Sequence, residues 1–349
     1  MFYDYKPSKD RYIIYKTNDG GVGDKLIGVM NAFLLAYLNG YSFRINDNTN
    51  TPMVEVFTSD HQWWLRDWYE KPLSRGRLNL LASYDEMTNL ITEGVIEDYY
   101  PNTECLYFYS NQNLIPFFFQ NPIYREKLER LGVDERNIYP EIFHFIFNLE
   151  NEYKKNFNYL KSKLFTNVKY VIGVHVRTNW NWGDVPQVSQ NTIQNYIRAI
   201  NQNYLPNARV LISSDSQEAY EMVKNGVVDM DVVRISGDAV HIGKDENSKT
   251  NDMLKAIYEI YLLSECDLLI GSYWSNFTRL SVMRNPRKTV LVELDVEPYD
   301  SAVDSTKYWI EQLSKSVDNI QNNVRGAFRF PIEIKGHTKC DPEVLFTLK

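Results

Sequence analysis

The chain has 349 residues, of which 44% are hydrophobic, which is enough to bury two cores of ordinary domain size. Its formal net charge of -7 excludes a global positive field that would hold a nucleic acid, so any phosphate site has to be local. Without a signal-peptide pattern or an apolar run near the roughly 20 residues of a membrane span, we expect a soluble, cytoplasmic protein whose three scattered cysteines are reduced.

The first 46 residues have the pattern of a β-α-β unit. The apolar run 12–15 predicts a strand, and a glycine-rich break leads into a helix expected over 24–39. Gly40 lies where a glycine commonly ends a helix, and residues 41–46 predict a second strand. We therefore expect an N-terminal Rossmann-like domain over 1–160.

The middle of the chain differs in composition, with aromatic runs between helices expected at 61–70, 85–97 and 122–132. Residues 151–163 then predict a polar, lysine-rich helix before a new strand begins. We place the domain boundary near residue 160 for this reason.

From about residue 161 to 325, strands and helices alternate at the spacing of a mostly parallel sheet. This predicts a second Rossmann-like domain, so that the fold class is α/β with two such domains facing a cleft. A last helix is expected over 307–323, and the polar tail 326–349 could pack back on the first domain. The predicted strands are 170–176, 208–213, 232–235, 268–271 and 288–294, and the predicted helices are 191–203, 216–224, 252–264 and one from about 275.

Three segments have the residue types of a phosphate site. The first is the loop 20–25, where Gly21 and Gly23 let backbone N–H groups approach an anion and the helix that begins at Asp24 adds positive potential. The loop is not a dinucleotide fingerprint, because Leu26 stands where the third glycine would be. A loop that only turns tightly would explain the same residues.

The second segment ends the strand 170–176. Because side chains alternate along a strand, His175 and Arg177 lie on one face, at the carboxyl end where open α/β sheets bind ligands. An arginine fork suits a diphosphate, since it makes two charge-assisted hydrogen bonds and keeps its proton. The alternative is a surface arginine beside a core histidine.

The third segment passes from a helix through a buried strand into a serine-rich turn. Ser272, Ser275 and Asn276 lie at the start of the next helix, which is again favourable for a phosphate. Ser275 as an ordinary N-cap is the simpler alternative, and the two roles are compatible.

The order of these segments resembles the GT-B fucosyltransferase superfamily, which includes nodulation-factor and core α1,6-, α1,2- and protein O-fucosyltransferases. The resemblance rests on His175-Val176-Arg177, the turn around Asp215 and the stretch 259–275, and it covers about 170–285. It implies an inverting, metal-independent transfer of L-fucose from GDP-β-L-fucose to a glycan hydroxyl. The expected partners are this GDP-sugar donor, bound by the domain over 161–325, and a glycan acceptor on the side of the domain over 1–160, with no cofactor and no metal.

The resemblance also implies roles for single residues. Arg177 would bind the β-phosphate and stabilise the departing diphosphate. The other expected donor-site residues are His175 beside it, Gly21, Gly23 and Asp24 of the loop, Asp215 and Ser216 of the nucleoside turn, Tyr196, Glu259, and Ser272, Ser275 and Asn276 of the serine-rich turn. Thr178 stands where the α1,2 and core α1,6 branches have a second arginine, so the linkage is left open.

Alternatives remain at this point. Asp184 is a candidate catalytic base, although a solvated loop aspartate would look the same. The chain could use another nucleotide sugar, or be a catalytically silent nucleotide- or glycan-binding module. A methyltransferase or dehydrogenase is disfavoured by the missing dinucleotide fingerprint.

Overall fold

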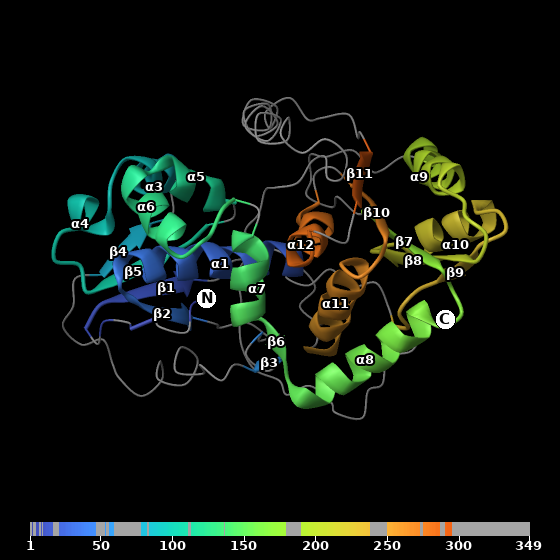
Figure 1. The fold of residues 1–349 in the computed structure, drawn as a ribbon, viewed down its shortest axis with the longest axis horizontal. Helices are drawn as coiled ribbons and strands as arrows, with labels where there is room; N and C mark the ends of the chain where they lie inside the picture. Colours follow the sequence, from blue (N-terminus) through green and yellow to red (C-terminus); the bar gives the residue numbers. More distant parts are fainter. Residues whose placement is uncertain are drawn as a thin grey trace. The chain divides into compact units, whose positions relative to one another are not determined.

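The structure is a computed structural model, and its described residues are 2, 5–6, 8, 10–16, 21–46, 53, 56–58, 78–81, 84–110, 113–135, 137–178, 190–237, 250–272, 275–286 and 290–294. They form two compact units (Figure 1): one up to Tyr153 together with residues 250–253, and one from Lys154 to Gly237 and from Leu254 to Leu294. No helix within these ranges has the length and apolar character needed to cross a membrane. The helices predicted at 61–70 and 307–323 and the tail 326–349 lie outside the described residues.

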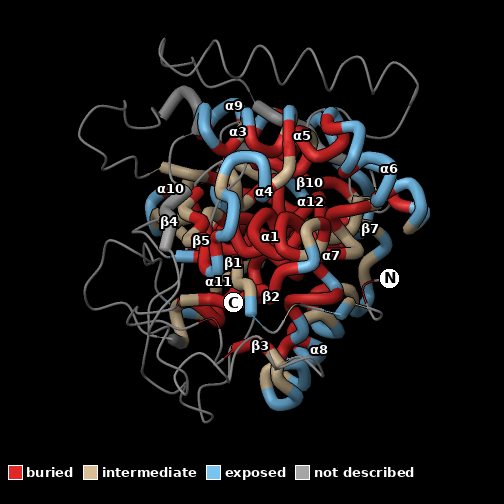
Figure 2. Tube along the Cα trace, turned by 90° about the vertical axis from the view of Figure 1, so that its left-hand side faces the viewer, coloured by how far each residue is buried: buried red, intermediate tan, exposed pale blue. Residues whose placement is uncertain are grey.

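The first unit is built on a parallel four-stranded sheet in the order β2-β1-β5-β4. Its strands are β1 (Tyr12–Lys16), β2 (Ser42–Asn46), β4 (Leu78–Leu81) and β5 (Cys105–Phe108). The predicted β-α-β unit is confirmed, with α1 (Val22–Asn39) between β1 and β2. Figure 2 shows α1 buried along its course, and most of its side chains are apolar. Gly40 ends it in the left-handed conformation, at φ 70°.

Short helices complete this unit, together with a small antiparallel pair of β3 (Phe57–Thr58) and β6 (Asn148–Leu149). The helices are α3 (Tyr84–Glu93), α4 (Ile96–Tyr99), α5 (Ile115–Gln120), α6 (Pro122–Arg130) and α7 (Ile138–Ile146). The single helix predicted at 85–97 is wrong, because the chain breaks at Gly94. A Cβ there would lie 2.7 Å from the Tyr99 ring, and the Asp98 carboxylate accepts the Val95 N–H at 2.9 Å to start α4.

The second unit is a doubly wound parallel sheet in the order β11-β10-β7-β8-β9, as predicted. The chain runs from β7 outward through β8 and β9, then returns to the other side of β7 for β10 and β11. The strands are β7 (Tyr170–Val176), β8 (Ala208–Ser214), β9 (Asp231–Val233), β10 (Leu268–Ser272) and β11 (Val290–Leu294); the helices are α8 (Asn151–Phe165), α9 (Gln190–Gln202), α10 (Gln217–Gly226), α11 (Thr250–Leu263) and α12 (Asn276–Arg284).

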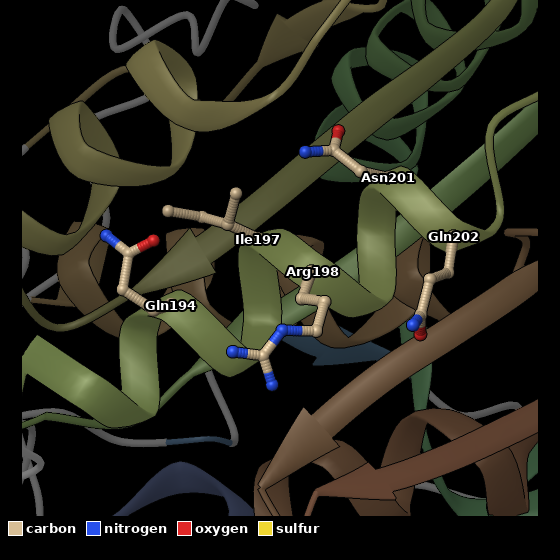
Figure 3. A pocket seen from close by; sticks show the side chains of 5 residues that line it. All are labelled: Gln194, Ile197, Arg198, Asn201 and Gln202. Carbon is tan, nitrogen blue, oxygen red and sulfur yellow. The ribbon is translucent and has the colours of Figure 1, made fainter.

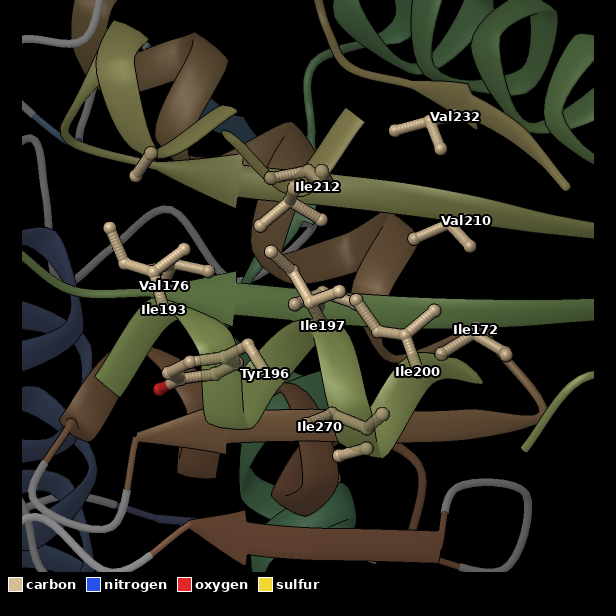
Figure 4. Packing of buried hydrophobic residues seen from close by; sticks show 14 of the residues in the cluster. Ile172, Val176, Ile193, Tyr196, Ile197, Ile200, Val210, Ile212, Val232 and Ile270 are labelled. Carbon is tan, nitrogen blue, oxygen red and sulfur yellow. The ribbon is translucent and has the colours of Figure 1, made fainter. Parts of the chain in front are cut away.

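One face of this sheet is an apolar core. Alternate residues of β7 and β8 pack there against α9 and α10, and Figure 4 shows Ile172, Val176 and Ile212 among them. The alternation of side chains along a strand means that Gly173, His175 and Arg177 belong to the other face.

The other face lies under α11 and α12, and two glycines allow these helices to come close. A Cβ on Gly173 would lie 2.9 Å from the Leu263 side chain, and a Cβ on Gly271 would lie 2.0 Å from Thr278 Cγ2. This face becomes polar towards the carboxyl ends of the strands, where it provides the candidate site.

Candidate functional site

The candidate site lies at the carboxyl ends of β7, β8 and β10. The register pairs His175 with Gly271 on one side and with Ser213 on the other. The strand order reverses between β7 and β10, and open α/β sheets bind ligands at such a switch point. The segments predicted separately as a phosphate strand and a serine-rich turn are therefore neighbours in the fold.

Arg177 and Asp215 form an ion pair at this edge. Arg177 Nη1 donates to Asp215 Oδ2 at 2.5 Å, and the two side chains are 21% and 11% exposed. The other carboxylate oxygen, Oδ1, accepts from the Thr178 backbone N–H at 2.8 Å and from its hydroxyl at 2.9 Å. Asp215 is thus held by three hydrogen bonds and fixes the orientation of the guanidinium, which has five N–H donors in all.

His175 is buried on β7, two residues before Arg177. Its Nδ1 lies 2.8 Å from the Thr278 hydroxyl oxygen, and its ring stacks on Phe277 with centroids 4.6 Å apart. Burial lowers the pKa of His175 to about 3, against the raising effect of the Asp215 charge and with a smaller lowering effect of the Arg177 charge. The imidazole is therefore neutral at physiological pH, and it links β7 to the start of α12.

Ser275 occupies the N-cap position of α12, as the sequence predicts. Its side chain makes no capping hydrogen bond with its helix, although the residue is only 8% exposed. The Arg279 N–H donates to the Ser275 carbonyl at 3.2 Å, which starts the backbone hydrogen bonding of α12. A helix start of this kind favours an anion. Ser272 is the last residue of β10.

Glu259 belongs to a buried polar network under the sheet. Its Oε1 accepts from Lys255 Nζ at 2.7 Å, and its Oε2 accepts from the Ser213 hydroxyl at 2.8 Å. Both charged side chains are about nine-tenths buried, at 10% and 9% exposure. Glu259 thus lies on the same face of the sheet as His175 and Arg177.

Two other predicted donor-site residues, Tyr196 and Ser216, make contacts that stabilise the fold. Tyr196 is 1% exposed and belongs to the apolar core under α9 (Figure 4), on the face opposite to Arg177. Ser216 is the N-cap of α10, where its hydroxyl accepts from the Ala219 N–H at 3.2 Å. Asp184 lies outside the described residues.

The glycine-rich loop belongs to the first unit, where Asp24 closes it. Asp24 Oδ2 accepts from the Gly21 N–H at 3.1 Å, and the Lys25 N–H donates to the Gly21 carbonyl at 2.9 Å. Gly23 is buried within the first turn of α1. A carboxylate already lies at this helix start, which favours a tight turn over an anion site here.

The sequence interpretation missed Thr278, Phe277 and Lys255. Lys255 had a usable signal, since it lies four residues before Glu259 on one helix face. Thr278 had none, because its contact with His175 joins residues 103 positions apart.

An open depression on α9 lies away from this site (Figure 3). It is lined by Gln194, Ile197, Arg198, Asn201 and Gln202. Because α9 covers the apolar face of the sheet, the depression is not continuous with the Arg177 face. Within the described ranges no three His, Cys, Asp or Glu side chains are grouped as metal ligands would be.

The sequence matches no protein-family model and no curated protein. Solved structures do match. A mutant of Arabidopsis thaliana FUT1 in complex with GDP has 15% identity and a TM-score of 0.62, over 84% of this chain and 73% of that chain. NodZ α-1,6-fucosyltransferase soaked with GDP-fucose has 19% identity and a TM-score of 0.52, over 82% and 96%. Selenomethionine NodZ from Bradyrhizobium has 20% identity and a TM-score of 0.52, over 83% and 96%.

At these identities the similarity is one of fold. The chain has the GT-B fold of fucosyltransferases, which confirms the fold class predicted from its motifs.

Proposed function

We propose that the protein is an inverting, metal-independent fucosyltransferase that transfers L-fucose from GDP-β-L-fucose to a glycan hydroxyl. The observation that carries the proposal is Arg177, held by Asp215 at the switch point of the second sheet, next to the start of α12. The likeness in fold to structures that contain GDP or GDP-fucose supports the same donor.

The proposed chemistry follows from where charge develops. When the C1–O bond of the donor breaks, negative charge builds on the diphosphate, and fixed donors placed there lower the barrier. Among the contacts described above, Asp215 bonds to Nη1 of Arg177 alone. The other guanidinium N–H groups are therefore available to the β-phosphate. Ser275 and the N–H groups at the start of α12 would assist from the neighbouring strand end.

His175 has a positioning role in this proposal. A neutral, buried imidazole that is stacked on Phe277 and bonded to Thr278 is suited to holding α12 against β7. The acceptor hydroxyl would lose its proton late, as the oxocarbenium-like centre is attacked from the opposite face. Asp184 remains the candidate for accepting that proton.

Nucleotide release from a panel of donors tests the proposal. The purified protein is incubated with GDP-fucose, GDP-mannose and UDP-sugars, with and without EDTA, and free nucleotide is measured. We expect GDP release from GDP-fucose that EDTA leaves unchanged. Release only from a UDP-sugar would contradict the donor assignment, and loss with EDTA that manganese restores would contradict the metal-independent mechanism. GDP binding without any turnover would favour the catalytically silent module.

A further inference from the structure

The buried pair of Lys255 and Glu259 is not explained by the stability of its helix. Lysine precedes glutamate by four residues, which is the less favourable order relative to the helix dipole. Both side chains are about nine-tenths buried, and a buried ion pair is often no more stabilising than apolar residues of the same size. A role in function therefore explains the pair better than a role in stability does.

The position of the pair indicates what that function is. Glu259 bonds to Ser213, which is the register partner of His175 on β8. The network thus lies two residues along the strands from Arg177 and Asp215, on the same face of the sheet. Glu259 accepts one hydrogen bond on each carboxylate oxygen, from Lys255 and from Ser213. A carboxylate has about four acceptor positions. Free acceptor positions remain for N–H or O–H donors of a ligand.

We propose that Lys255 is a positioning residue for donor binding, which holds the Glu259 carboxylate in the orientation that accepts hydrogen bonds from the nucleoside part of the donor. This rests on the proposed function, since it concerns the same donor site. Without the ammonium group, Glu259 would keep only the Ser213 hydroxyl of these two partners, and its Oε1 would lose the contact that orients it. A carboxylate that has to be ordered when the ligand arrives binds it less tightly, because ordering a side chain costs conformational entropy.

Other charged groups on the elements around this face are few and mostly paired. His175 is neutral, and Arg177 and Asp215 bond to each other. The remaining charged or titratable described side chains on α11 and α12 towards this end are Asp252, Tyr258 and Arg279. Lys255 is the cation that the structure places directly on Glu259.

The test is calorimetric titration with GDP of the wild type and of Lys255→Met. We expect GDP affinity to fall about tenfold to a hundredfold in Lys255→Met, the range for losing hydrogen bonds to a charged group.

Matched variants separate positioning from folding. Lys161→Met removes the ammonium group of another ion pair, 2.8 Å from Glu265 at the amino end of β10, and should leave GDP affinity unchanged. Lys255→Arg should recover most of the affinity. The double variant Lys255→Met/Glu259→Gln removes both charges, and it should fold and bind GDP weakly.

Two results would overturn the proposal while GDP still binds the wild type. One is a folded Lys255→Met with wild-type GDP affinity, and the other is a double variant that binds GDP as tightly as the wild type. If the wild type itself does not bind GDP, the proposed function fails instead, which is a different result.

Discussion

Two clusters of charged residues at opposite ends of the second sheet differ in how far they are exposed to solvent. At the amino end of β10, Glu265 accepts from Lys161 of α8 at 2.8 Å and from Arg284 of α12 at 3.0 Å. Arg284 also donates to the Ser264 hydroxyl and lies over the Tyr261 ring, 4.3 Å from its centroid. This cluster joins three helices and is internal to the fold.

At the carboxyl end, the Arg177 side chain is 21% exposed, whereas the Arg284 side chain at the amino end is 12% exposed. Arg177 bonds to the Asp215 carboxylate, whose other oxygen accepts two hydrogen bonds from Thr178. An arginine that is oriented by its neighbours and still reaches solvent can receive a ligand, whereas one enclosed by three helices stabilises the fold. The comparison predicts that variants at the two ends separate activity from stability.

The largest effect should come from Arg177→Ala. Charge on the diphosphate grows as the sugar leaves, so the lost contact should lower kcat more than donor affinity. We expect a loss of about 100- to 1,000-fold in kcat, by analogy with removal of one oxyanion donor. Arg177→Lys should recover little, because a point charge does not reproduce the fork. Steady-state kinetics checks this, and near-native turnover of folded Arg177→Ala would show that this strand end is structural.

Arg284→Met at the other end should reduce stability and leave turnover per folded molecule unchanged. Removing one partner of a buried ion pair costs about 3 kcal/mol or more in the free energy of unfolding. Urea denaturation followed by fluorescence measures the loss. An equal loss of kcat in the folded variant would mean that the two ends are coupled.

The same cluster predicts how stability depends on pH. Burial alone would raise the pKa of Glu265, but hydrogen bonds and charges from Lys161 and Arg284 outweigh it and lower the pKa from 4.5 to about 2. A carboxyl whose pKa is lowered by folding stabilises the protein above its unfolded pKa, and this stability is lost as pH falls from 4.5 towards 2. The loss should be on the order of 2–3 kcal/mol, and it should be absent from Glu265→Gln in parallel urea titrations.

Gly271→Ala should affect both activity and stability, because Gly271 lies where α12 meets the sheet. The new Cβ would lie 2.0 Å from Thr278 Cγ2, so α12 must move and the bond from Thr278 to His175 is disturbed. Overpacking of this kind costs about 1–3 kcal/mol. Thermal denaturation and kinetics together check it, and an unchanged melting temperature with unchanged turnover would contradict it.

The smallest effect should come from Ser216→Ala. Its hydroxyl caps α10, so we expect a loss of about 1 kcal/mol in stability with little change in GDP affinity. A large loss of GDP affinity in the folded variant would instead support the donor contact predicted from the sequence.

The sequence predicted the parts of this site that depend on local pattern. Alternation along one strand was enough to place His175 and Arg177 on one face, and the apolar run before Ser272 was enough to place a helix start beyond it. The pairing of Arg177 with Asp215 was not predictable in this way, because it depends on the register of β7 with β8. Tyr196 lies on α9, where apolar residues at helical spacing form a buried face. Its side chain belongs to this core, although its place in the sequence resembles that of a donor-site tyrosine.

A crystal structure of the protein with GDP tests the central claim most directly. The account predicts the β-phosphate within hydrogen-bond distance of the Arg177 guanidinium and the start of α12, with Asp215 still bonded to Arg177. A nucleotide bound in the second unit without contact to Arg177, or bound only at the Gly21–Gly23 loop, would contradict it.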